Sequence, residues 1–234
     1  MTAKEFFKKY HHAWPLLYVF IYLPWFAWLE KEVTTEFNLI HVPLDDKIPF
    51  CEYFVIPYFL WFLFVPAVVI YLFFYSRKEF YEACAFLFIG MTAFLILCTV
   101  WPNGLNLRQD ISYRDNVCAD LVRMLYKTDT STNVFPSLHV FNTLGCLIAL
   151  YKSKGMKNHR VIKLLATILS ISIVLSTMFL KQHSIIDVIG AFGLAIIMYL
   201  IVYVPDWSKI FSKRAANTVS ESDTAVLETA SDEE

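Results

Sequence analysis

Apolar segments of about the length needed to cross a lipid bilayer make up most of this sequence. A helix that spans the hydrocarbon core needs roughly 20 mainly apolar residues. The chain is 57% hydrophobic and only 18% charged, whereas a soluble domain carries roughly 25% charged residues. We therefore expect an all-α membrane protein, a six-transmembrane-helix bundle, with spans at 13–29, 54–75, 81–101, 136–151, 161–180 and 185–204. The first and fourth of these are short for a full crossing.

Lysine and arginine gather in alternate connections between these segments. They precede the first span, join the second to the third and the fourth to the fifth, and follow the sixth: Lys4, Lys8, Lys9, Arg77, Lys78, Lys152, Lys154, Lys157, Arg160, Lys163, Lys209, Lys213 and Arg214. Cytoplasmic loops carry such an excess of basic residues. We expect both termini to be cytoplasmic and the segments 30–53, 102–135 and 181–184 to lie on the outer face of, most simply, the plasma membrane.

The C-terminal end differs in composition from the rest of the chain. Residues 215–234 contain six acidic residues and no basic ones, which is typical of a disordered tail. We divide the chain into a membrane domain, 1–209, and an acidic tail, 210–234. The net charge of −1 indicates no nucleic-acid partner. Cys51 and Cys118 fall on the same outer side, and the sequence leaves open whether they pair.

A histidine and an aspartate mark the junction of the last two spans. His183 and Asp187 are four residues apart, so on a helix they share one face and can form an oriented imidazole–carboxylate pair. Such a pair leaves the other ring nitrogen free to act as a nucleophile. The alternative is a polar pair at a helix start, with Asp187 favoured by the helix dipole. Lys181 is either a cation for phosphate oxygens or an interfacial lysine.

A second polar segment, Pro136-Ser137-Leu138-His139, opens the fourth span. Proline is tolerated in the first turn of a helix, and a helix N-terminus with Ser137 is a favourable place for a phosphate. His139 lies in the same turn, where it could protonate a leaving oxygen. The alternative is a helix cap beside an interfacial histidine. Arg108, just beyond the third span, is a further candidate for phosphate binding.

These segments together resemble the type-2 phosphatidic acid phosphatase (PAP2) superfamily of membrane lipid phosphatases. That family has three motifs: Lys-x6-Arg-Pro, Pro-Ser-Gly-His and Ser-Arg-x5-His-x3-Asp. The second is similar to 136–139 with leucine in place of glycine, and the third to Ser176-Thr177 followed by His183 and Asp187. The resemblance covers about residues 80–204 and includes the expected six-span topology.

The chain departs from the family pattern at several cations. The first motif keeps only Arg108, because Trp101 stands at the lysine position and Gln109 at the proline position. Thr177 stands at the arginine position of the third motif. Lys181 could replace one missing cation from a different place. The leucine at 138 and the Lys-Gln-His sequence at 181–183 look like the branch that contains inositol-phosphoceramide synthase-like transferases.

The resemblance implies a catalytic cycle on a histidine nucleophile. His183 would form a phosphohistidine, Asp187 would orient it, and His139 would act as general acid and then base. Arg108, Ser137 and Lys181 would bind the phosphoryl oxygens. The resemblance implies a phosphoric monoester or diphosphate hydrolase that needs no metal and no cofactor. Its substrate would be a lipid phosphate such as phosphatidic acid, undecaprenyl diphosphate or phosphatidylglycerol phosphate.

Two other functions stay open. A lipid phosphotransferase would use the same residues, because water and an alcohol attack the same intermediate. A non-catalytic transporter or scaffold would need ionisable residues inside the spans, and no Asp, Glu, Lys or Arg lies mid-span. The sequence also leaves open whether the protein forms a homo-oligomer.

Overall fold

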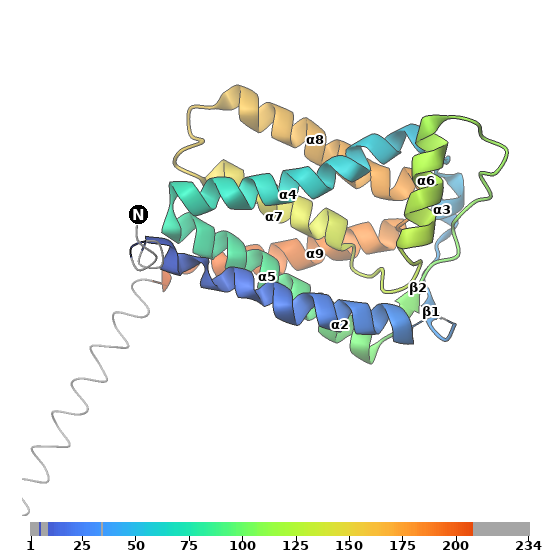
Figure 1. Ribbon diagram of the computed structural model, residues 1–234, viewed down its shortest axis with the longest axis horizontal. Helices are drawn as coiled ribbons and strands as arrows, with labels where there is room; N and C mark the ends of the chain where they lie inside the picture. Colours follow the sequence, from blue (N-terminus) through green and yellow to red (C-terminus); the bar gives the residue numbers. More distant parts are fainter. Residues whose placement is uncertain (1–4, 6–8, 34, 208–234) are drawn as a thin grey trace, which may run out of the picture.

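The computed structural model describes residues 5, 9–33 and 35–207. The described chain is mainly helical, in agreement with the predicted fold class, and its long helices lie side by side (Figure 1). The elements follow one another as η1 (His11–Tyr18), α2 (Val19–Glu32), β1 (Asn38–Leu39), α3 (Pro43–Lys47), η2 (Glu52–Phe54), α4 (Val55–Tyr75), α5 (Arg77–Val100), β2 (Asn103–Gly104), α6 (Val117–Thr128), α7 (Leu138–Lys152), α8 (Arg160–Phe179) and α9 (Ile185–Val202). The predicted tail, 210–234, lies outside the described residues.

Four helical segments in the described part of the chain are long and apolar enough to cross a membrane: Glu52–Tyr75, Arg77–Val100, Arg160–Phe179 and Ile185–Val202. They correspond to four of the six predicted spans. The other two are shorter helices, since α7 has 15 residues and α2 has 14. The described helices thus account for four of the six predicted crossings by length and composition. The first and fourth predicted crossings stay predictions.

The first predicted span is divided between two kinds of helix. Pro15 lies within the 3-10 helix η1 and Pro24 within α2, and proline removes a backbone hydrogen-bond donor from a helix. This segment packs along α5, where the Tyr18 ring stacks on Phe88 with centroids 4.7 Å apart. The hydroxyl groups of Tyr18 and Thr92 are 2.9 Å apart. The segment is therefore attached to the bundle by aromatic packing and side-chain hydrogen bonds.

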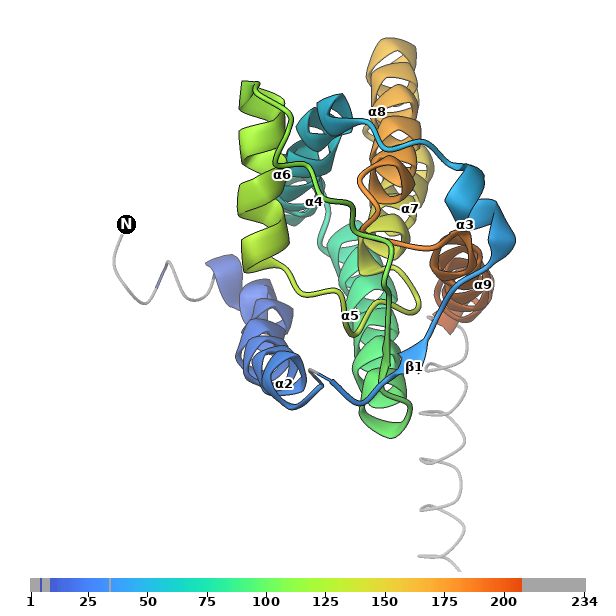
Figure 2. The same cartoon turned by 90° about the vertical axis from the view of Figure 1, so that its right-hand side faces the viewer.

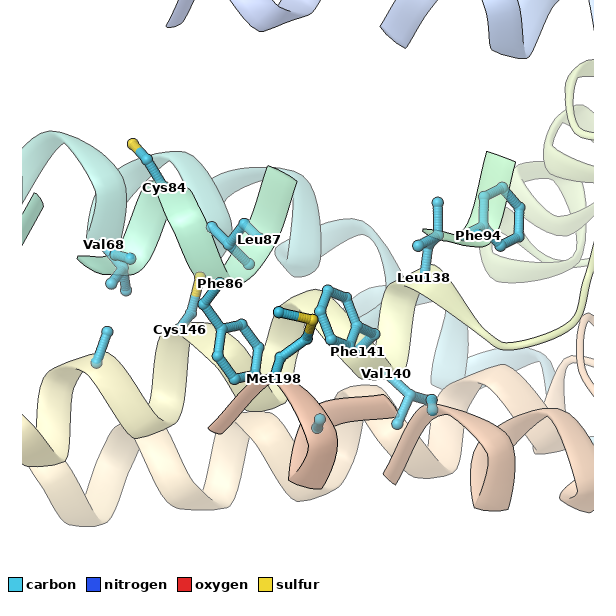
Figure 3. Close-up of a cluster of buried hydrophobic side chains, with 14 of the residues drawn as sticks. Val68, Cys84, Phe86, Leu87, Phe94, Leu138, Val140, Phe141, Cys146 and Met198 are labelled. Carbon is cyan, nitrogen blue, oxygen red and sulfur yellow. The ribbon is translucent and has the colours of Figure 1, made fainter. Parts of the chain in front are cut away.

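The bundle core is built mainly from residues of α4, α5, α7, α8 and α9, and Figure 3 shows part of it. The rings of Phe86 on α5 and Phe141 on α7 stack with centroids 5.1 Å apart. Glycines make room for these rings: a Cβ at Gly145 would lie 2.7 Å from Phe86, and one at Gly90 would lie 2.1 Å from Phe141. Small residues of this kind allow close packing of membrane helices.

One end of the bundle carries elements that the sequence analysis did not predict. The helices α3 and α6 and the parallel pair β1–β2 gather there, while the α4–α5 and α7–α8 connections lie at the opposite end (Figures 1 and 2). The buried Asn103 of β2 holds the segment before α7, because its Oδ1 atom accepts hydrogen bonds from the backbone N–H groups of Val134 and Phe135, both at 2.9 Å. This contact positions the chain just before Pro136.

Candidate active site

The turn between α8 and α9 places His183 and Asp187 in contact, as their spacing predicts. His183 Nδ1 lies 3.3 Å from Asp187 Oδ2, and both residues are buried. Ser184 is the N-cap of α9, and its backbone N–H donates to the same Asp187 oxygen at 2.9 Å. The carboxylate thus faces Nδ1 of the imidazole and leaves Nε2 free for another partner.

His139 lies in the first turn of α7 and faces His183. The centroids of the two imidazole rings are 5.8 Å apart. The His139 ring packs between Tyr58 and Trp61 of α4, with centroid separations of 4.6 and 4.5 Å. Aromatic neighbours on two sides restrict the ring orientation, so α4 helps to hold the second histidine toward the first.

Ser137 connects the starts of α7 and α9. Its hydroxyl group accepts a hydrogen bond from the backbone N–H of Val140, as an N-cap does. Its own N–H donates to the backbone carbonyl of Asp187 at 3.1 Å. The serine is buried, and these contacts fix the distance between the two histidine-bearing turns.

Arg108 lies beside the site and is held by acceptors of the chain. Its Nη atoms donate to the backbone carbonyls of Tyr126, Asp129 and Thr130 and to Gln182 Oε1, at 2.8–2.9 Å. Burial lowers its pKa from the usual value, although the guanidinium remains charged. The arginine therefore joins the segment after α6 to the turn that carries His183.

The ammonium group of Lys181 also donates to backbone carbonyls. Its Nζ atom lies 2.6 Å from Asp45 O and 2.5 Å from Ile48 O, at the end of α3. The side chain is buried, and burial lowers its pKa from the usual value. Two of its three donors are thus used in fixing α3 to the turn. This placement differs from the expectation that Lys181 points at the phosphoryl group.

Asp45 is a site residue that the sequence analysis missed. The sequence predicts an outer loop at 30–53, yet the Asp45 carboxylate is buried against the N-terminus of α9. It accepts hydrogen bonds from Ser184 Oγ at 2.7 Å and from Ile185 N at 2.9 Å. The helix dipole favours a carboxylate at this position. Its neighbour Asp46 contacts His41 instead and is exposed. Two adjacent acids thus have opposite surroundings, which no local sequence signal distinguishes.

A cavity of about 490 Å³ opens beside the two histidines. Its polar part is lined by side chains with hydroxyl, amide, carboxylate and imidazole groups: Thr128, Asp129, Thr130, Thr132, Asn133, His139, Asn142, Gln182 and His183. Its apolar part lies between α2, α4 and α5 and includes Tyr22, Leu23, Phe26, Phe59, Trp61, Phe62, Met91 and Phe94. The cavity therefore suits an amphipathic molecule whose polar end reaches the histidines.

Asp129 is the carboxylate that lines this cavity, and the sequence analysis did not select it. Its Oδ2 atom accepts a hydrogen bond from the buried Tyr58 hydroxyl at 3.1 Å. Burial raises the pKa of Asp129, and the nearby His183, Arg108 and Tyr58 oppose this effect. Because the Tyr58 ring also packs on His139, one tyrosine joins this carboxylate to the site.

Cys51 and Cys118, whose pairing the sequence leaves open, are free thiols. Arg114 pairs with the buried carboxylate of Glu52, and this contact raises its pKa. Within residues 5, 9–33 and 35–207, no three His, Cys, Asp or Glu side chains form a group that could hold a metal ion.

The fold and the site together define a membrane-type helical bundle with a paired-histidine centre at one end. The family model of the PAP2 superfamily matches residues 107–210. The matched segment contains Arg108, His139, His183 and Asp187. No curated protein and no solved structure matches the chain.

The family match agrees with the resemblance found in the sequence motifs. It supports a phosphatase or phosphotransferase that acts on lipid-like substrates. Because members of the superfamily are generally phosphatases, it favours a phosphoester hydrolase. Together with the apolar helices, it also supports an integral membrane protein.

Proposed function

We propose that the protein is a lipid phosphatase or phosphotransferase in which His183 is the nucleophile, Asp187 orients it and His139 is the acid–base partner. The observation that carries this proposal is the placement of the two imidazoles, 5.8 Å apart, at the polar end of a largely apolar cavity. A phosphorus atom between the rings could be reached by His183 on one side, with a leaving oxygen toward His139.

In the first step, His183 Nε2 forms a bond to phosphorus while the bond from phosphorus to the leaving oxygen breaks. The leaving oxygen takes a proton from His139. In the second step, neutral His139 removes a proton from water, whose oxygen attacks phosphorus and displaces His183. An alcohol in place of water gives transfer rather than hydrolysis. Asp187 accepts the hydrogen bond from Nδ1 and stabilises the imidazolium-like charge during both steps.

The other residues predicted to bind the phosphate act by positioning the elements that surround the two histidines. We propose that Ser137 sets the distance between α7 and α9, and that Arg108 and Lys181 hold the loops around His183. The N-terminus of α7 and the positive Arg108 favour an anion at the centre. The apolar part of the cavity accommodates the hydrocarbon chains of the substrate.

The membrane orientation is part of this proposal. Seven of the predicted cytoplasmic cations lie in the α4–α5 and α7–α8 connections or in the adjoining helix ends, at the end opposite the site (Figure 1): Arg77, Lys78, Lys152, Lys154, Lys157, Arg160 and Lys163. The positive-inside rule supports a site on the extracytoplasmic face, and we propose that the membrane is the plasma membrane. The partners are the lipid substrate and the bilayer, and the chemistry uses no metal or cofactor.

The test is phosphohistidine formation by the purified protein in detergent. Wild-type protein mixed with a ³²P-labelled lipid phosphate and quenched in alkali should carry label that acid removes, and His183→Ala should carry none and lose turnover by at least about 10⁴-fold. Activity should survive dialysis against EDTA. Near-normal turnover by a folded His183→Ala protein would disprove the covalent mechanism, and a complete loss in EDTA that zinc restores would disprove metal independence.

A further inference from the structure

The cavity is lined by buried groups that lack hydrogen-bond partners within the described part of the chain, three of them amides at its polar end and one the indole N–H of Trp61. The atoms are Trp61 Nε1, Asn133 Oδ1, Asn142 Oδ1 and Gln182 Nε2, and all four residues line the cavity. Asn133, Asn142 and Gln182 are each at most 5% exposed. A buried polar group without a partner is unfavourable, so several of them around one cavity point to a ligand that supplies the missing bonds.

The neighbours of the amides determine which of these atoms donate and which accept. Gln182 Oε1 accepts from Arg108 at 2.9 Å, which leaves Nε2 as a donor. Asn133 Nδ2 donates to Glu30 Oε1 at 2.9 Å, which leaves Oδ1 as an acceptor. The indole N–H of Trp61 can only donate. The cavity therefore offers donors and acceptors together, and the Asp129 carboxylate adds a further acceptor.

A bare phosphoryl group can pair with the hydrogen-bond donors of the cavity but not with its acceptors. Ionised phosphate oxygens accept hydrogen bonds and cannot pair with Asn133 Oδ1 or Asp129, whereas a hydroxyl group both donates and accepts. Charge leads to the same conclusion. No lysine or arginine is among the described residues that line the cavity, while Asp129 is. Arg108 contacts Gln182 from outside this lining. A doubly charged phosphate monoester beside the carboxylate would therefore be repelled with only this one nearby cation, among the described lysines and arginines, to offset it, and a singly charged diester would be repelled less.

We propose that the polar end of the cavity is a subsite for a hydroxyl-bearing headgroup esterified to the substrate phosphate, with Asp129, Asn133 and Gln182 as its hydrogen-bonding partners. This inference rests on the proposed function and specifies its substrate class as phosphodiester lipids of a polyol. Asp129 accepts from a headgroup hydroxyl, and Gln182 donates to another.

The test compares three lipids with identical acyl chains in detergent micelles. Phosphatidylglycerol is a diester with hydroxyl groups, phosphatidylcholine is a diester without hydrogen-bond donors, and phosphatidic acid is a monoester. We expect kcat/KM, followed as lipid consumed, to be at least about 10-fold higher for phosphatidylglycerol than for either of the others, because its hydroxyl groups can donate to the charged Asp129 and such hydrogen bonds are among the stronger ones. Equal values, or a preference for phosphatidylcholine or phosphatidic acid, would overturn the proposal.

A matched pair of variants assigns the effect to Asp129. Asp129→Asn can still accept from Tyr58 but removes the charge, and it should lower the kcat/KM ratio of phosphatidylglycerol to phosphatidylcholine by about 10-fold. Asp120→Asn changes an exposed acid that pairs with Arg123 on α6 and should leave the ratio unchanged. An unchanged ratio in Asp129→Asn would overturn the assignment.

The source of the hydroxyl and the validity of the proposed function are tested separately. If phosphatidic acid with added free glycerol reaches the phosphatidylglycerol rate, the hydroxyl belongs to an acceptor alcohol, which overturns the headgroup assignment. If wild type and His183→Ala consume all three lipids equally slowly, the proposed function itself fails.

Discussion

The two ends of the helical bundle are built in different ways. At one end a single residue, Ser76, joins α4 to α5, and residues 153–159 join α7 to α8. At the other end, longer segments fold into α3, α6 and the β1–β2 pair, and they bury charged groups such as Asp45 and Lys181. Burying a charge is unfavourable unless hydrogen bonds compensate it. The buried polar network therefore marks the end where position matters to function.

After His183→Ala, the largest effect on this comparison should come from His139, at the end that carries α3 and α6. His139→Ala removes the proposed proton donor and should lower kcat by about 10²–10⁴-fold, because the leaving oxygen departs without protonation. Stopped-flow and steady-state kinetics on the purified variant measure the loss. A substrate with an activated phenol as leaving group should recover most of the first step, and equal losses with activated and natural substrates would contradict the acid role.

The next effect should come from Asp45, which binds the N-terminus of α9. Asp45→Asn keeps the size of the side chain but weakens its contacts with Ser184 and Ile185. Because these contacts position the turn carrying His183, we expect kcat to fall by about 10–100-fold with KM changed less than about threefold.

Asp46→Asn is the control, since Asp46 is exposed and contacts His41. It should retain activity within about twofold. Equal losses in the two variants would mean that the segment 43–47 acts through its overall charge and not through Asp45.

Lys181 should affect stability as much as catalysis. Lys181→Gln replaces an ammonium that donates to two carbonyls of the α3 segment, and the loss should destabilise the fold by about 1–3 kcal/mol. We expect a lower Tm in detergent and a kcat lowered by about 10-fold through displacement of His183. A loss of about 10²–10³-fold in kcat at unchanged Tm would instead support a direct contact between Lys181 and the phosphate, as the sequence predicts.

The smallest effect should come from the basic end. Lys157 is exposed in the α7–α8 connection, and Lys157→Ser should change both kcat and Tm by less than the error of most assays, because surface substitutions usually stay within about 0.5 kcal/mol. A clear loss of activity in this variant would show that the two ends of the bundle are coupled, and that position matters to function at both.

The long helices were predictable because their signal is local. The predicted span 54–75 corresponds to α4, Val55–Tyr75, and the span 185–204 to α9, Ile185–Val202. A run of apolar residues in lipid satisfies its backbone hydrogen bonds within one helix, so composition and length suffice. The spacing of His183 and Asp187 was informative for the same reason, since a pair four residues apart meets within one helical turn.

The roles of the charged residues were decided by the tertiary structure. Lys181 and Asp45 are 136 positions apart, and Arg108 and Gln182 are 74 apart. Their contacts exist only because α3 and the segment after α6 fold over the turn between α8 and α9. The sequence by itself determined the four membrane-length helices and the contact between His183 and Asp187. Which cations face a substrate and which ones hold the backbone depended on packing between distant segments, because a long flexible side chain binds whichever buried acceptor the fold brings within reach.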